Sequence, residues 1–245
     1  MSEHFFSSAW QAQPLGRRGF LRVSAASAAT VAVVAATGCS TSTPEPTVVD
    51  PYALALPTGD RGLLFYVYML AIAQATLYQK VVDSPPTDLT TAERAIFSDL
   101  RDHEVIYREL FKYALDPTAL VTLLPTDFTF KLTSFNLTTR AGVLAAAQQL
   151  EDLVTAAYPT LLPLHTAAGA LQQSLLLKIA SVQARHAATV RDLLTPGSFA
   201  NDDVVESTGT LAGQARTKTP TEVMAALAPF FAPYVVSVTN LAVPV

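Results

Sequence analysis

The sequence is poor in cysteine, glycine and charge, and each shortage excludes a class of protein. Its single cysteine, Cys39, rules out a disulfide within the chain. Its 10 glycines form no glycine-rich phosphate loop. Charged residues make up 15% of the chain and the net charge is −4, so we expect no nucleic-acid partner. Hydrophobic residues make up 50%, which suits one globular domain with extensions.

The N-terminus carries the features of an export segment. Arg17 and Arg18 precede an uncharged run from Val23 to Ala36, and Cys39 follows it. This run is shorter than the roughly 20 apolar residues of a membrane span. The stretch resembles a twin-arginine signal that ends at a lipoprotein processing site, with alanine at position 36 where leucine is usual and Cys39 as the residue that receives the lipid.

These features divide the chain into sections with different expected roles. The sections are a signal peptide over 1–38, lipidated Cys39 with a flexible Ser/Thr/Pro-rich tether over 39–57, a helical domain over 58–195, and a loop with a short helix over 196–245. We expect an exported protein, periplasmic or at the cell surface, held on a membrane by its lipid. The sequence identifies no protein or small-molecule partner.

Proline positions delimit the helices of the domain. Because proline breaks a helix interior, each long window without it can hold a helix of 20 or more residues. The windows are 58–84, 87–116, 126–158 and 164–195. No alternating strand pattern persists between them, so the predicted fold is an all-α four-helix bundle.

The lengths of the connections predict the topology. The turn at 84–87 is short, so the first two helices should be antiparallel neighbours, and Thr90 with Glu93 fits a capping box. The stretch 116–138 has no helical stripe and is long enough for a crossover along the bundle. Pro159 and Pro163 mark another short join, and Thr219 caps a short helix from Pro220 to about Phe231 that should pack on the bundle.

Each predicted helix has an apolar seam at helical spacing that is interrupted by polar residues near its middle. The fourth seam is Leu176, Ile179, Gln183, His186, Val190 and Leu193. The other seams contain Gln74, Glu104 with Tyr107, and Glu151. Glutamate is almost never buried without a partner, so we expect these side chains to meet at one level of the core.

The segments that carry these residues resemble a known family. They include GDRGLLFYVYMLAIAQATLY, DHEVIYREL, LAAAQQLEDLVTAAY and IASVQARHAATVRDLL. Over roughly 59–234 the sequence is similar to the ferritin-like domain family, in particular its exported branch of desiccation-related proteins. The resemblance implies a ferritin-like bundle, whose metal-binding members hold two irons with a glutamate, E-x-x-H, a glutamate and E-x-x-H on successive helices.

The chain keeps only part of that ligand set. Glu104, Glu151 and His186 match it. The other positions hold Ala71 or Gln74, Tyr107 and Gln183. Two carboxylates would not neutralise two divalent irons, so a dinuclear centre is not expected.

Two arrangements of the remaining residues are open. In the first, which the missing ligands favour, Gln74, Tyr107 and Gln183 donate to the carboxylates in a closed hydrogen-bonded cluster without a cofactor. In the second, Glu104, Glu151 and His186 hold one iron, manganese or zinc ion. His103 lies outside the seam and is expected on the surface, whereas the first helix's tyrosines, Tyr66, Tyr68 and Tyr78, are expected as core or rim aromatics.

The two arrangements imply different functions. A closed cluster favours a non-catalytic binding or structural protein of the cell envelope, related to stress, in which the di-iron centre has decayed. The alternative is a metal-dependent oxidase or peroxide-handling protein that uses the reduced site.

Overall fold

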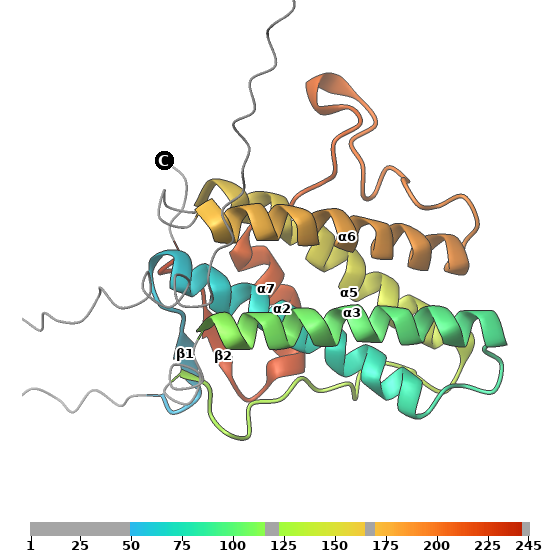
Figure 1. Cartoon of the computed structure of the whole chain (residues 1–245), viewed down its shortest axis with the longest axis horizontal. Coiled ribbons are helices and arrows are strands. Elements are labelled where there is room, and N and C mark those ends of the chain that lie inside the picture. The colour runs from blue at the N-terminus through green and yellow to red at the C-terminus, as the bar shows by residue number, and fades with distance from the viewer. Residues whose placement is uncertain (1–49, 116–122, 165–169, 242–245) are drawn as a thin grey trace, which may run out of the picture. The chain divides into compact units, whose positions relative to one another are not determined.

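The computed structural model describes residues 50–115, 123–164 and 170–241, and Figure 1 shows their arrangement. Four long helices form the bundle: α2 (Gly59–Asp83), α3 (Thr91–Leu115), α5 (Arg140–Leu161) and α6 (Ala170–Leu194). α3 packs mainly on α2, α6 packs mainly on α5, and α2 joins the two pairs by packing on α5. The all-α ferritin-like bundle is therefore confirmed. The predicted signal peptide and Cys39 lie outside the described residues.

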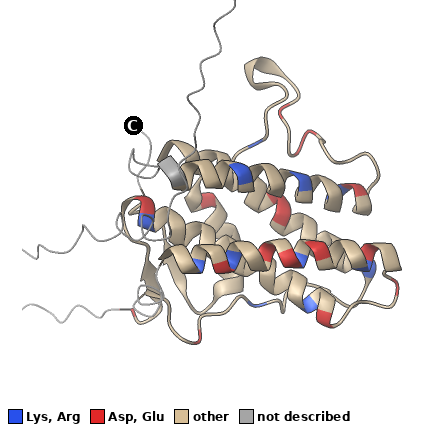
Figure 2. Cartoon of the chain, in the orientation of Figure 1, with Lys and Arg blue, Asp and Glu red and all other residues tan. Residues whose placement is uncertain are grey.

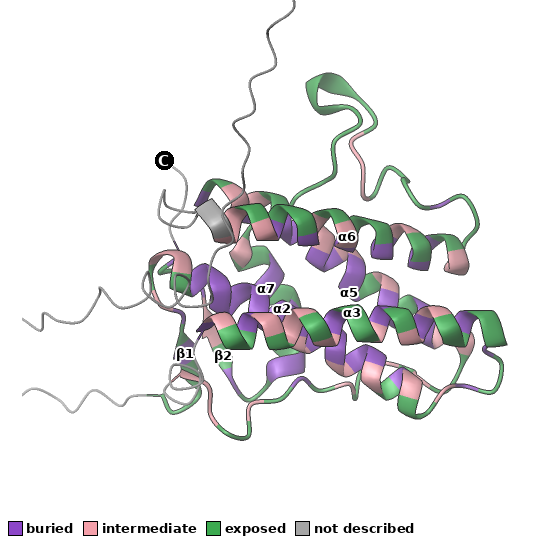
Figure 3. Cartoon of the chain, in the orientation of Figure 1, coloured by how far each residue is buried: buried purple, intermediate pink, exposed green. Residues whose placement is uncertain are grey.

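α2 is the central helix of the bundle. It is buried nearly all round, as the purple ribbon in Figure 3 shows, and Phe65, Tyr66, Val67, Met69 and Leu70 have no exposed surface. Among the described residues, α2 is the one helix long and apolar enough to cross a membrane, and 78% of its most apolar stretch is buried within the protein. A helix that is hydrophobic on every side is what the core of a helical domain requires.

α3 is amphipathic. One stripe, which contains Phe97, Leu100, Glu104 and Phe111, is buried. Its outer surface carries acidic and basic residues side by side, as Figure 2 shows. The predicted capping box is present at its start, where Thr90 N donates to Glu93 Oε2 at 2.8 Å and Glu93 N donates to Thr90 Oγ1 at 3.2 Å.

The connection from α3 to α5 runs back along the bundle. Asp127, in this connection, accepts a hydrogen bond from Tyr234 near the end of the chain. The connection ends beside the α2–α3 turn, where Arg140 N donates to Asp88 and the Arg140 side chain pairs with Glu93 at 2.6 Å. α5 therefore begins at the level where α3 begins, as the predicted crossover requires. Residues 116–122 of the predicted crossover lie outside the described residues.

The short C-terminal helix is α7 (Pro220–Phe231), with the predicted capping box between Thr219 and Glu222. It packs on α5 and against the crossover, where Lys131 N donates to Phe230 O at 2.8 Å. Rings of the crossover stack on it: Phe128 on Phe231, and Phe130 on Phe230. The helix thus fastens the long connection to the bundle.

The structure corrects two predicted boundaries. The tether was expected to reach residue 57, but β1 (Ala53–Ala55) pairs in parallel with β2 (Val235–Ser237), and Leu54 and Leu56 are buried. Alternate apolar residues turned inward explain why this segment is part of the domain. The join expected at Pro159 is also wrong, since α5 continues to Leu161 and is followed by η2 (Leu162–Leu164). Pro159 lies inside α5, near its end, and the helix continues past it.

The loop after α6 is fixed by one buried arginine. Arg191 on α6 pairs with Asp152 on α5 at 2.7 Å and with Asp203 in the loop at 2.6 Å. Further along, the loop contains η4 (Gly209–Leu211) and an antiparallel bridge between Val205 and Ala215. The Arg191 contacts hold the start of this polar segment against the bundle.

Candidate metal site in the bundle core

The four bundle helices bring the predicted polar residues together in the core. Glu104 and Glu151 have no exposed surface, and Gln74, Gln183 and His186 are buried beside them. Each sits within an apolar helical seam, so the packing of the seams places the polar side chains at one level. The prediction that these side chains lie together in the core is therefore confirmed.

Glu104 lies at the end of a chain of hydrogen bonds. Gln74 Nε2 donates to Gln183 Oε1 at 2.9 Å, and Gln183 Nε2 donates to Glu104 Oε1 at 2.9 Å and Oε2 at 3.1 Å. His186 Nδ1 lies 3.1 Å from Glu104 Oε1. Both oxygens of Glu104 therefore have a partner, and two glutamines fix its orientation.

Glu151 is less well satisfied. Tyr78 donates its hydroxyl to Glu151 Oε1 at 2.5 Å. Among the described residues, Glu151 Oε2 and Gln74 Oε1 are buried without a hydrogen-bond partner. Gln74 Oε1 is always an acceptor, and Glu151 Oε2 is one when its carboxyl is ionised. A proton on Glu151 or a nearby cation would therefore satisfy Glu151 Oε2. Without such a proton, the closed network that the sequence favoured is incomplete.

Burial controls the charges of the cluster. It raises the pKa of Glu104 to about 8, against a smaller lowering by the Gln183 hydrogen bond. Burial, followed by the charge of Glu104, raises the pKa of Glu151 to about 8. Burial also lowers the pKa of His186. Near neutral pH the protein without a cation therefore holds protons on its carboxyls and keeps His186 neutral.

The same three side chains can hold one metal ion. One ligand atom each from Glu104, Glu151 and His186 lies within 4.8 Å of the other two. Two carboxylates balance a divalent charge, and carboxylate with imidazole suits iron, manganese or zinc. Glu151 Oε2, which has no hydrogen-bond partner in the described ranges, adds an oxygen that needs a positive neighbour. One ion fits these residues, whereas the uncharged Gln74, Tyr107 and Gln183 do not suit a second.

Two residues of the site were not predicted. Tyr78, one turn beyond Gln74 on α2, occupies the donor role expected of Tyr107, and in the described part of the protein Tyr107 makes no hydrogen bond with either carboxylate. His103 is exposed as expected, but its Nδ1 lies 2.9 Å from Nε2 of His186. Spacing offered a signal for both residues, because side chains four residues apart share a helix face. Tyr78 is four residues from Gln74, and His103 is four residues from Tyr107.

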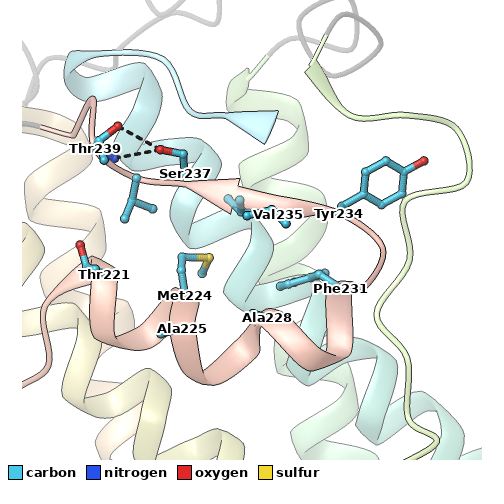
Figure 4. A pocket seen from close by; sticks show the side chains of 11 residues that line it. Thr221, Met224, Ala225, Ala228, Phe231, Tyr234, Val235, Ser237 and Thr239 are labelled. Atoms are coloured by element: carbon cyan, nitrogen blue, oxygen red, sulfur yellow. Dashed lines mark hydrogen bonds between the residues drawn. The ribbon is translucent and has the colours of Figure 1, made fainter. Parts of the chain in front are cut away.

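A separate cavity lies between α7 and β2. It has a volume of about 240 Å³ and is lined mainly by small and apolar side chains, among them Met224, Ala228, Phe231 and Val238. Figure 4 shows Met224 reaching from the helix toward the strand. None of its lining residues belongs to the polar cluster.

The fold and the core cluster together define a class, that of helical bundles with carboxylates and histidine between their helices. The chain matches the family described as ferritin-like domain over residues 59–196, more than half of its length, and it belongs to that family. No curated protein and no solved structure matches the chain.

Proposed function

We propose that this protein is a cell-envelope member of the ferritin-like family that binds a single divalent transition-metal ion and is not an oxygen-activating enzyme. The observation that supports the proposal best is the approach of Glu104, Glu151 and His186 to within 4.8 Å, with Glu151 Oε2 lacking a partner among the described residues. An ion at this position would neutralise both carboxylates and act as a Lewis acid.

The surroundings of the ligands support binding over turnover. Glu104 and Glu151 are completely buried and His186 is 6% exposed, so a reacting molecule has little access to the ion. Gln183 donates to both oxygens of Glu104, and Tyr78 donates to Glu151, as outer partners of metal ligands commonly do. These contacts favour a fixed site over one that changes coordination during a reaction.

Metal content of the purified full chain tests this proposal. We expect about one iron, manganese or zinc ion per chain after incubation with each metal, and loss of the ion in Glu151→Gln and His186→Ala. Glu109→Gln, an exposed glutamate on the same helix as Glu104, is the control and should bind normally. A content near two ions, or near zero in the wild type, would overturn the single-ion site.

A metal-free structural bundle is the second candidate, and the raised pKa values favour it, because protons on Glu104 and Glu151 can replace a cation. The oxidase or peroxide-handling alternative makes a different prediction. It requires oxygen or peroxide consumption that disappears in His186→Ala, and a wild-type protein with bound metal but no such consumption would contradict it.

We also propose that the chain is exported through the twin-arginine pathway as a stress-related lipoprotein anchored through Cys39. Arg17 with Arg18, the uncharged run after them and the single cysteine support this. Cys39→Ala should release the protein from membranes, and a double substitution Arg17→Lys with Arg18→Lys should block export. Membrane retention of Cys39→Ala would contradict lipidation, which fractionation and the mass of the N-terminal peptide would measure.

A further inference from the structure

His103 and His186 form a hydrogen-bonded pair between the surface and the core. His103 Nδ1 and His186 Nε2 are 2.9 Å apart. The ring centres are 5.1 Å apart and the rings are 7° from parallel. That separation is about the nitrogen–nitrogen distance plus the distance from each nitrogen to its ring centre, so the bond lies close to both ring planes. Ring N–H groups and nitrogen lone pairs point in this direction.

The two nitrogens of His186 have different partners. Nε2 contacts His103, and Nδ1 lies 3.1 Å from Glu104 Oε1, inside the ligand cluster. A neutral imidazole carries its proton on one nitrogen and a lone pair on the other. When Nε2 carries the proton, Nδ1 offers its lone pair to an ion; when Nδ1 carries it, the ring donates to Glu104 and cannot bind the ion.

We infer that His103 is a positioning residue that accepts the Nε2–H of His186 and thereby keeps Nδ1 available to a metal ion. This inference rests on the proposed metal site. Among the described residues, no other side chain forms a hydrogen bond with Nε2 of His186. Partners of this kind fix the ring orientation and tautomer of histidine ligands, and their removal weakens metal affinity by about 10- to 100-fold.

The test compares three variants of the full chain in titrations with Co²⁺ alone, followed by visible absorption. His103→Leu removes the acceptor and should weaken Co²⁺ binding by about 10- to 100-fold. His103→Asn places an amide oxygen near the position of Nδ1 and should restore affinity to within a few-fold of the wild type. Asp99→Ala, exposed and one turn earlier on α3, is the control and should bind normally.

A second measurement separates this inference from the metal site itself. ¹⁵N NMR of the ring nitrogens, before metal is added, reports which nitrogen of His186 carries the proton. We expect Nε2 in the wild type and in His103→Asn, and a shift toward Nδ1 in His103→Leu. Wild-type affinity in His103→Leu, absence of rescue by asparagine, or a proton on Nδ1 in the wild type would overturn the positioning role. Failure of the wild type to bind any metal would instead overturn the proposed function.

Discussion

Two polar clusters involve side chains of α5 and α6, and they differ in how their charges are satisfied. The first, which we call the arginine clasp, consists of Arg191, Asp152 and Asp203. The second is the core cluster around Glu104, Glu151 and His186. Glu151 and Asp152 are neighbours in the chain, yet each belongs to a different cluster.

The arginine clasp contains its own counter-charges. Arg191 makes two hydrogen bonds to each of its aspartates, and the pair raises its pKa above the usual range for arginine. The core cluster contains two acids and a histidine whose pKa is lowered, and it has a carboxyl oxygen without a partner among the described residues. Structural clusters can close on themselves, whereas a cluster short of positive charge is suited to take up a cation.

The largest effect on stability should come from opening the arginine clasp. Arg191→Ala removes the buried guanidinium that joins Asp152 to Asp203 and creates a gap, while both aspartates keep contact with water, so we expect a loss of about 1–3 kcal/mol in the free energy of unfolding. Urea denaturation measures it. Arg185→Ala, an exposed arginine on the same helix, is the control, with a change within about 0.5 kcal/mol. Equal effects for the two variants would show that the clasp contributes nothing.

The core cluster should make the stability of the metal-free protein depend on pH. The pKa values of Glu104 and Glu151 are raised to about 8, so the folded state keeps protons that the unfolded state releases near pH 4.5. Stability should therefore fall as pH rises toward 8, by about 1.4 kcal/mol per pH unit for each carboxyl that stays protonated in the folded state. The lowered pKa of His186 acts in the other direction below about pH 6.5, so the fall is clearest between pH 6.5 and 8.

Denaturation of the metal-free protein across this pH range checks the effect. Glu151→Gln removes one of the two titrating carboxyls and should flatten the curve. A stability that rises between pH 6.5 and 8 would contradict the raised pKa values.

The smallest effect concerns a single hydroxyl. Tyr78→Phe removes the donor to Glu151 Oε1, and we expect a loss of about 1 kcal/mol in stability above pH 8, where the carboxylate needs that donor most. Tyr66→Phe is a matched control on the same helix, because the Tyr66 hydroxyl is buried without a partner among the described residues. Its removal should be neutral or stabilising. Thermal unfolding of both variants measures the difference, and a larger loss in Tyr66→Phe would refute the assignment.

Helical spacing was enough to predict the bundle and the residues at its polar level. Gln74, Glu104, Glu151, Gln183 and His186 each interrupt an apolar seam, and a seam determines which side of its helix faces the core. The capping boxes at Thr90 and Thr219 were likewise readable, because their partners lie three residues away.

The contacts that were missed depend on distant elements. Spacing does not say whether Tyr78 or Tyr107 reaches a carboxylate, because that depends on how each helix is rotated. The bond between His103 and His186 joins residues 83 positions apart, and β1 pairs with a strand near the end of the chain. Such contacts depend on tertiary packing, which leaves little trace in a single sequence.

Proton release on metal binding tests the central claim most directly. The metal-free full chain would be titrated with Zn²⁺ at pH 7 by calorimetry in two buffers of different ionisation enthalpy. Because the carboxyls of Glu104 and Glu151 hold protons near neutral pH, binding should saturate at one ion per chain and release between one and two protons. Saturable binding without proton release, or no saturable binding, would contradict a site in which one ion replaces the protons of the core cluster.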